Sequence, residues 1–311
     1  MDEQWERSLP LYPLAEEEAL ALLRRWDDGI QRAELTPVKV GCRNSNFHVT
    51  TERGEYLLRL CPPGTIYWRT EKAVQSALAE SGVMPRLMAC LQGPDKRPAL
   101  IYQWIPSVSL LEAQGKGRIP LPLIRQAAAC AAIIHRTPPP EGMEEVSIPP
   151  IEEWAPLFLK NPRTQARLGR PLADRVRTVM ARQSGMLKQI EALQGLIHSD
   201  IRPAKMIVDA NRRLYVVDWE AARTGHILAD IGQFFRYRHI FTAEDEAAFE
   251  QAYQAAGGRK LPAGWRRLSR LRDVMNPLQL LGTPGHTPRR DQDLIRLVED
   301  TVRFFEKEDG T

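Results

Sequence analysis

The chain has 311 residues, and its 43 lysines and arginines against 39 acidic residues give a formal charge of +4. Hydrophobic residues make up 43% and charged residues 26% of the chain, a globular composition that excludes a disordered or fibrous protein. So small a positive excess does not predict a nucleic-acid or membrane partner. At roughly 100–200 residues per domain, the length predicts about two domains or lobes.

Targeting and cysteine patterns indicate the compartment. No apolar run approaches the roughly 18 residues that a membrane span needs. Residues 1–7 lack the basic-then-apolar order of a secretory signal. The four cysteines show no C-x-x-C spacing, so neither a zinc site nor a redox motif is predicted. We therefore expect a cytoplasmic protein with reduced thiols.

The first third of the chain alternates between helical and strand-like patterns. An amphipathic pattern over 14–26 has acidic residues in its first turn and arginines in its last, which suits the helix dipole. A second helical period covers 69–81 and ends at Gly82. Strand-like patterns are found near 38–40, 47–49, 56–60, 86–91 and 99–104. They predict a small antiparallel sheet in an N-terminal, nucleotide-binding lobe over residues 1–105.

Helical patterns dominate after Pro106. An alanine-rich helix is predicted over 121–136, and the prolines that follow stop it. Further long helices are predicted over 172–193, 244–256, 265–281 and 291–306, with one β-like segment over 197–218. The sequence therefore predicts an α+β, two-lobed fold in which residues 106–311 form the larger, mostly helical lobe.

The most informative motif is the loop His198-Ser199-Asp200, which is followed by a hairpin turning at 209–212 and then by Asp218. A hairpin returns the chain to its start, so both carboxylates can face one cavity. Phosphoryl transfer needs two such carboxylates, one to accept the proton of the attacking hydroxyl and one to hold Mg²⁺. Taken alone, the motif is better explained as a surface hairpin with ordinary turn aspartates.

Segments elsewhere resolve this ambiguity, because together they resemble the aminoglycoside phosphotransferase/choline kinase family, which has the protein-kinase-like fold. The loop at Asp200 resembles the family's H-G-D catalytic loop, and Val217–Glu220 resembles its metal-binding segment. Gly41–Phe47 resembles its nucleotide loop, and its residues are similar to those of type II homoserine kinases. The matching segments cover roughly residues 36–235 in the family's order.

The resemblance implies an enzyme that transfers the γ-phosphate of ATP, with Mg²⁺ as cofactor, to a hydroxyl group of a small molecule. It implies that Asp200 is the catalytic base, that Asp218 is the metal ligand, and that Arg59, paired with Glu71, contacts the phosphates. The remaining nucleotide-binding residues are expected to be Asn44 and Ser45 in the loop, Gln103 and Ile105 in the adenine hinge, and Lys205.

Lys205 departs from the family pattern. The family has Asn at this position, where its side-chain oxygen binds Mg²⁺, whereas an ammonium group has no acceptor atom. Two interpretations stay open. Lys205 neutralises the phosphates directly in a working kinase, or the site is degenerate, as in a pseudokinase or a spore-coat-type structural member of the same superfamily.

Neighbouring residues have simpler interpretations. His198 is expected to support the catalytic loop by hydrogen bonds rather than to take part in catalysis. Asp230 fits the N-cap of a helix over 231–239, and the resemblance adds that it braces the catalytic loop. Glu220 is either a second metal ligand or a solvent-facing residue at a strand end.

Charge patterns bear on the acceptor and on other partners. Between Lys160 and Lys188 eight basic residues face one acid, which disfavours a polycationic aminoglycoside if this segment lines the cleft. An acidic patch over 141–153 opposes that argument, so the acceptor stays open. Four arginines over 265–281 also allow a nucleic-acid binder, although a solvated basic helix face explains them better. We expect no nucleic-acid partner.

Overall fold

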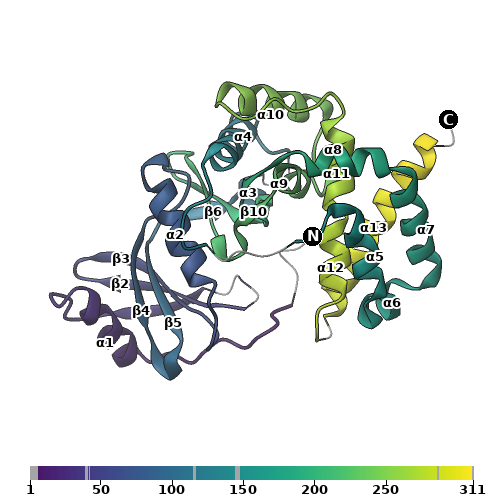
Figure 1. Cartoon of the computed structure of the whole chain (residues 1–311). Coiled ribbons are helices and arrows are strands. Elements are labelled where there is room, and N and C mark those ends of the chain that lie inside the picture. The colour runs from purple at the N-terminus through teal and green to yellow at the C-terminus, as the bar shows by residue number, and fades with distance from the viewer. Residues whose placement is uncertain are drawn as a thin grey trace.

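The computed structural model describes residues 6–38, 41, 43–114, 117–143, 148–285 and 287–309. A five-stranded antiparallel sheet forms one part of the molecule and a mostly helical part follows it (Figure 1), so the predicted α+β fold is confirmed. The strand order is β1-β2-β3-β5-β4. The strands are β1 (Glu34–Val38), β2 (Ser45–Thr51), β3 (Gly54–Leu60), β4 (Leu87–Gln92) and β5 (Pro98–Gln103).

The central strand β3 separates two environments because successive side chains point to opposite faces of a sheet. Leu58 and Leu60 join the apolar core that the sheet forms with helix α1 (Glu16–Trp26). Arg59 lies between them in sequence and faces the other side, toward helix α2 (Trp68–Leu78). Helix α2 lies between the sheet and the helical part in Figure 1. The alternation thus places a cation where the two parts of the molecule meet.

The helical part carries two small sheets that position the motif at Asp200. Strand β7 (Gln194–Ile197) pairs with β10 (Arg223–His226), and β8 (Met206–Asp209) pairs with both β6 (Ser107–Ser109) and β9 (Leu214–Val216). The predicted hairpin is therefore formed by β8 and β9. The loop that carries Asp200 spans the gap between β7 and β8 and ends in the 3₁₀ turn η4 (Pro203–Lys205).

Most of the remaining chain is helical. The helices are α3 (Leu110–Gln114), α4 (Leu121–Arg136), α5 (Ile151–Lys160), α6 (Pro162–Leu168), α7 (Arg170–Arg182), α8 (Ser184–Glu191), α9 (Ile227–Phe234), α10 (Ala243–Ala255), α11 (Trp265–Asp273), α12 (Met275–Leu281) and α13 (Pro288–Asp309). None of the helices in the described ranges is both long and apolar enough to cross a membrane.

Two of the predicted long helices are wrong, because each is two helices in the structure. The pattern over 265–281 breaks at Val274, since the ring of Pro277 clashes with the carbonyl group four residues earlier and is tolerated only in the first turn of a new helix. The pattern over 172–193 breaks at Gln183, directly before Ser184 and Gly185, which have low helix propensity.

The segment before α1 contacts both parts of the molecule. The Glu6 carboxylate accepts hydrogen bonds from the backbone N–H groups of Arg289 (3.0 Å) and Arg290 (3.4 Å) at the start of α13. Such N–H groups in a first helical turn have no partner within the helix. The Arg7 guanidinium donates to the carbonyl oxygens of Gly41 and, at 2.8 Å, Asn44. Residues 6–7 therefore tie the loop before β2 to helix α13.

The predicted lobe boundary at residues 105/106 falls between the end of β5 and the start of β6, and the division into two domains stays a prediction. Cys61, Cys90 and Cys130 carry free thiols. Cys42 lies outside the described residues.

Candidate active site

A cavity of about 250 Å³ lies between the sheet and the β8–β9 hairpin. Its apolar wall includes Leu57, Met84, Ile207, Val217 and Trp219. Its polar lining consists mainly of Asn46, Arg59, Glu71, Lys205 and Asp218, and the hinge residues Gln103 and Ile105 also border it. The cavity therefore combines an apolar slot of the kind that holds a planar base with a charged region suited to phosphates.

Arg59 is the buried cation of the cavity. One terminal nitrogen, Nη1, donates to both carboxylate oxygens of Glu71 at 3.2 Å, and Nη2 lies 2.7 Å from Oδ1 of Asp218. Its Nε donates to Oδ1 of Asn46 at 3.2 Å. Burial would lower the pKa of Arg59, but the charges of Glu71 and Asp218 outweigh it and raise that pKa well above its usual value. Arg59 thus stays charged between the two carboxylates.

Asp218 is held by a second cation. Lys205 Nζ donates to Oδ2 of Asp218, while Arg59 occupies Oδ1. Burial would raise the pKa of Asp218, yet Lys205 and Arg59 together keep that pKa well below its usual range. The pKa of Lys205 is raised because the charges of Asp218 and Asp200 outweigh its burial. Both carboxylate oxygens of the expected metal ligand are therefore in ion pairs.

This donor set does not fit Mg²⁺ in the way that the family pattern implies. Mg²⁺ requires an octahedron of oxygen ligands, whereas Lys205 offers none and each oxygen of Asp218 already contacts a cation that would repel Mg²⁺. Within the described ranges, no group of three or more His, Cys, Asp or Glu residues could hold a metal ion.

Asp200 lies outside the lining of the cavity, on the adjoining loop. Its carboxylate forms a two-point ion pair with Arg202, with Nε 2.6 Å from Oδ1 and Nη2 2.8 Å from Oδ2. Burial would raise the pKa of Asp200, but the charges of Arg202 and Lys205 outweigh it and lower that pKa. Lys205 therefore interacts electrostatically with both Asp200 and Asp218, and this shared cation links the two carboxylates.

His198 fixes the geometry between these carboxylates. Its Nδ1 accepts a hydrogen bond from the backbone N–H of Asp200 at 3.2 Å, so its Nε2 carries the proton that it donates to the carbonyl of Val217 at 3.0 Å. Burial lowers the pKa of His198 and favours this neutral form. The loop of Asp200 is thereby joined to the residue before Asp218, and the predicted supporting role of His198 is confirmed.

The carboxylate of Asp230 supports the same loop through hydrogen bonds. It accepts hydrogen bonds from the backbone N–H groups of His198 and Ser199, each at 2.8 Å, and contacts His135 Nε2 at 3.2 Å. The predicted N-cap role is wrong, because Asp230 lies inside helix α9 and the N-cap residue is His226. The carboxylate of Asp230 is directed at another loop rather than at its own helix.

The predicted loop residues lie beside the cavity rather than in its lining. The Asn44 side chain donates to the Glu220 carboxylate at 2.7 Å, and Ser45 Oγ accepts from the backbone N–H of Tyr12 at 2.8 Å. Gly41 and Asn46, from the same loop, do line the cavity. Glu220 bonds Asn44 across the two parts of the molecule, and burial and the charge of Asp218 raise its pKa. The nucleotide-binding roles of Asn44 and Ser45 stay predictions.

Two charge patterns singled out in the sequence lie elsewhere. In the described part of the chain, none of the eight basic residues between Lys160 and Lys188 lines this cavity. The expected solvated face over 265–281 is wrong for Arg272, which is 3% exposed, bonds His226 Nδ1 at 3.0 Å and lies over the Trp154 ring. Of the acidic patch, residues 144–147 fall outside the described ranges.

Sequence reasoning missed three polar side chains of the site. Tyr102 donates its hydroxyl hydrogen to Glu71 and lies under Arg59 at 5.6 Å. Asn46 orients Arg59, and Arg202 pairs with Asp200. Tyr102 on β5 pairs in register with Leu57 of β3, two residues before Arg59 and on the same face of the sheet, a placement that only the structure shows.

The chain matches known proteins at the level of family and fold. A model of the phosphotransferase enzyme family (APH) matches residues 34–271, whereas no curated protein matches the sequence significantly. A solved structure of a microcompartment-associated aminopropanol kinase is 17% identical, with a TM-score of 0.68 over 93% of this chain and 96% of that one.

Two aminoglycoside-modifying enzymes are similar to the same degree. Aminoglycoside phosphotransferase APH(4)-Ia is 16% identical, with a TM-score of 0.68 over 93% of this chain and 99% of that one. Spectinomycin phosphotransferase APH(9)-Ia, solved with ADP and spectinomycin, is 13% identical, with a TM-score of 0.67 over 94% and 98%. These structures establish the protein-kinase-like fold, and the match over residues 34–271 shows that the chain belongs to the phosphotransferase enzyme family.

Proposed function

We propose that this protein transfers the γ-phosphoryl group of ATP to a hydroxyl group of a small molecule. The observation that carries the proposal is the meeting of Arg59 and Lys205 in one cavity with the hinge residues Gln103 and Ile105, next to the loop of Asp200. The apolar wall suits the adenine ring, which the backbone groups of the hinge would bind, and the two cations suit the phosphates.

In the proposed reaction, the acceptor hydroxyl oxygen attacks the γ-phosphorus atom while Asp200 takes the hydroxyl proton. The bond from the γ-phosphorus to the bridging oxygen breaks, and ADP leaves with that oxygen. The lowered pKa of Asp200 keeps it ionised at neutral pH, as an acceptor for the hydroxyl group must be. Phosphoryl transfer passes through a loose transition state, so positioning and charge stabilisation carry most of the catalysis.

Lys205 and Arg59 supply that stabilisation in this proposal. Both are bound to Asp218 in the structure, so phosphate oxygens must compete with one carboxylate for two cations. A lysine ammonium on a flexible stem can move from the carboxylate to a phosphate more easily than an arginine held on three sides. Lys205 is therefore the group proposed to follow the phosphate, while Arg59 stays fixed by Glu71 and Asn46. The expected Mg²⁺ stays a prediction.

The first experiment tests the base. ADP formation would be screened against alcohols, amino alcohols and aminoglycosides, with Asp200→Asn assayed beside the wild type. We expect the variant to lose about a thousandfold or more in kcat while binding ATP with an unchanged Kd. Asp174→Asn, on exposed helix α7, is the matched control and should keep full activity. Full activity of Asp200→Asn would remove Asp200 from its role.

The second experiment tests Lys205, because the two interpretations of this residue predict opposite results. Lys205→Asn supplies the family's amide oxygen and removes the ammonium. In a kinase adapted to lysine, ATP binding in EDTA should weaken by about tenfold or more, the value of one charge-assisted hydrogen bond. Lys188→Asn, on helix α8, is the control. A variant that gains Mg²⁺-dependent activity, or a wild type that binds no ATP at any Mg²⁺ concentration, would instead favour the degenerate site.

A further inference from the structure

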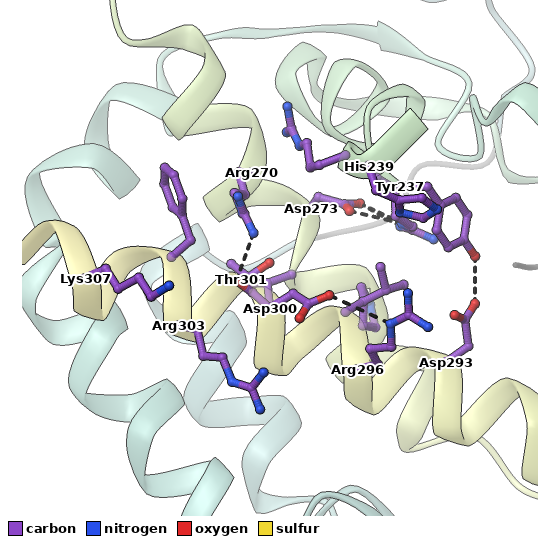
Figure 2. Close-up of a pocket in the computed structure, with 16 residues that line it drawn as sticks. Tyr237, His239, Arg270, Asp273, Asp293, Arg296, Asp300, Thr301, Arg303 and Lys307 are labelled. Atoms are coloured by element: carbon purple, nitrogen blue, oxygen red, sulfur yellow. Dashed lines mark hydrogen bonds and ion pairs between the residues drawn. The ribbon is translucent and has the colours of Figure 1, made fainter. Parts of the chain in front are cut away.

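A second and larger cavity, of about 500 Å³, lies within the helical part of the molecule. It is bordered by the turn η6 (Arg238–Ile240) and the residues just before it, by helices α11 and α12, and by helix α13 (Figure 2). Neither the proposed reaction nor the sequence motifs use this cavity. Its lining residues come from three segments that are far apart in the chain.

The lining is strongly basic. Six arginine and lysine side chains border the cavity against three aspartates, and His239 adds a titratable group. The six cations are Arg236, Arg238, Arg270, Arg296, Arg303 and Lys307. A partly open cavity with this excess of one charge attracts counter-ions of the opposite sign.

Carboxylates pair with four of these six cations. Asp273 forms a two-point ion pair with Arg236, with contacts from 2.6 to 3.3 Å, and Asp300 lies 4.0 Å from Arg296. From outside the lining, Glu246 pairs with Arg238 at 3.3 Å and Glu299 with Arg303 at 3.0 Å. Asp293 accepts a hydrogen bond from the Tyr237 hydroxyl at 2.7 Å. Figure 2 shows the side chain of Arg270 extending toward helix α13.

Donor groups remain unmatched at the cavity wall. Nη1 of Arg236 and Nη2 of Arg238 are buried, and neither has a hydrogen-bond partner among the described residues. Buried donors without partners are rare in folded proteins and call for an explanation such as a missing ion or ligand. Both side chains border the cavity, so a small shift of either guanidinium group toward a negatively charged ligand there would give its free donor a partner.

Arg270 is a further cation of the cavity, and it forms no ion pair in the described part of the chain. It donates to the backbone carbonyl of Asp300 at 2.8 Å and lies over the Phe304 ring at 4.2 Å. Within the described ranges, no carboxylate lies within ion-pair distance of it. Burial, and after it the repulsion from Arg238, lower the pKa of Arg270 to about 10. A bound anion would relieve this repulsion.

The cavity is close to the catalytic loop. The Gln233 side chain on helix α9 donates to the carbonyl of Ser199 at 2.9 Å. Arg236 follows three residues later, and three residues span at most about 10 Å. The charges of Arg236 and Arg202, the partner of Asp200, also interact. The same short segment thus borders both the loop of Asp200 and the basic cavity.

We propose that this cavity binds a small anionic molecule through a phosphate or carboxylate group held by Arg236, Arg238 and Arg270. The planar guanidinium groups match the two-point geometry of both anions. Pro277, Leu297 and Phe304 provide apolar surface for a carbon skeleton. The ligand is either the hydroxyl acceptor itself, which deepens the proposed function and rests on it, or a separate effector.

The binding test uses inorganic phosphate as the probe and thermal unfolding as the readout, with sodium chloride at equal ionic strength as the reference. We expect phosphate to raise the Tm of the wild type by about 3 °C. Arg270→Gln should lose most of this shift, and Arg270→Lys should recover part of it. Arg267→Gln, on the same helix but paired with Glu308 at 2.9 Å outside the cavity, should keep the whole shift.

The nucleotide cavity also contains cations, so the Lys205→Met variant separates the two sites. A shift that survives in Lys205→Met and disappears in Arg270→Gln supports the proposal. A shift that disappears in Lys205→Met and survives in Arg270→Gln places phosphate in the nucleotide cavity and overturns it. The absence of any shift in the wild type also overturns it. Because this test measures binding only, its result does not depend on whether the protein is a kinase.

The source of the anion is identified with two pairs of compounds. Glycerol 3-phosphate and glycolate carry a hydroxyl group, whereas methyl phosphate and acetate do not. If the cavity holds the acceptor, ATP consumption should occur only with a hydroxyl-bearing anion, and Arg270→Gln should raise its KM with kcat nearly unchanged. If the cavity holds an effector, the compounds without a hydroxyl group should bind equally well and change the KM of another acceptor.

Discussion

The two cavities differ in how completely their cations are paired with carboxylates. In the cavity between the sheet and the hairpin, Arg59 is shared by Glu71 and Asp218, and Lys205 is paired with Asp218. In the cavity of the helical part, four of the six cations also pair with carboxylates, but buried donors of Arg236 and Arg238 have no partner among the described residues and Arg270 forms no ion pair there. Matched buried charges stabilise one arrangement of the chain, whereas unmatched ones leave donors for a ligand.

The two cavities also differ in the backbone strain of the residues around them. Ser199 (φ +68°) and Asp218 (φ +73°) adopt left-handed conformations next to the first cavity, a state that costs L-residues roughly 1–2 kcal/mol each. The described residues that line the basic cavity include no such conformation. Strain concentrates where surrounding contacts fix a residue in one geometry, which fits the roles proposed here: a preformed reaction site in the first cavity and a ligand pocket on regular helices in the second.

The largest expected effect contrasts the two arginines. Arg59→Met leaves Glu71 and Asp218 buried without their shared cation, and we expect it to lower the free energy of unfolding by about 3 kcal/mol. Arg270→Gln should leave that free energy nearly unchanged, because the removed repulsion from Arg238 offsets the lost contact with Phe304. Urea unfolding would measure both. Equal losses in the two variants would contradict the contrast.

Acid should destabilise the helical part, because it protonates His226 and so adds a positive charge there. Burial and Arg272 lower the pKa of His226 to about 4, with Arg223 also nearby and Glu191 opposing them. A base whose folded pKa is depressed is destabilising once protonated, so stability is complete above pH 6.5 and falls toward pH 4. We expect a loss of about 2 kcal/mol between pH 7 and pH 5.

Urea unfolding of His226→Gln over the same pH range checks this prediction. The variant should lose about 2 kcal/mol less than the wild type between pH 7 and pH 5. His198, whose pKa is also lowered by burial, is retained in the variant and accounts for any remaining slope. An unchanged pH profile in His226→Gln would assign the acid sensitivity to other groups.

A smaller effect is expected from increasing the charge imbalance of the basic cavity. Asp300→Asn removes one of the three carboxylates and a loose contact with Arg296 at 4.0 Å. Phosphate affinity in an isothermal titration should rise about threefold, the value of one partly exposed charge. Asp174→Asn, on helix α7, removes a charge outside the cavity and should change nothing. Weaker binding by Asp300→Asn would count against an anionic ligand.

The smallest effect concerns the strained backbone of the first cavity. Ser199→Gly should raise the free energy of unfolding by about 0.5 kcal/mol, because glycine adopts positive φ without the cost that serine bears but loses more entropy on folding. Thermal unfolding would measure the gain. Destabilisation would show that the serine side chain makes a contact worth more than the strain.

Much of the fold could be predicted from sequence, because residues such as proline end a helix through their effect on neighbouring residues in the chain. Helix α4 ends at Arg136 as predicted, since Pro138 follows within two residues. The break before α12 was missed although Pro277 signals it, because the apolar period continues across it. Strands β6 and β10 were missed because three or four residues are too few to show alternation.

The candidate site was less predictable. Arg59 and Glu71 could be paired through the family pattern, but the double hold of Arg59 and Lys205 on Asp218 depends on how β3 and η4 meet in space. Local pattern alone indicated a helix cap for Asp230, and only the family resemblance indicated that it braces the loop of Asp200, since a side chain's choice between its own helix and a distant loop leaves no local pattern. The basic cavity collects side chains from segments near residues 236, 270 and 300, and no spacing rule joins them.

The contacts of residues 6–7 have a mechanical consequence. Glu6 accepts hydrogen bonds from the first turn of α13, and Arg7 donates hydrogen bonds to the loop that leads into β2. These hydrogen bonds therefore connect the sheet to the helical part, in addition to the chain segment between β5 and β6. A movement of the sheet away from α13 would have to break these hydrogen bonds, so the spacing between the two parts depends on two side chains that precede the first helix.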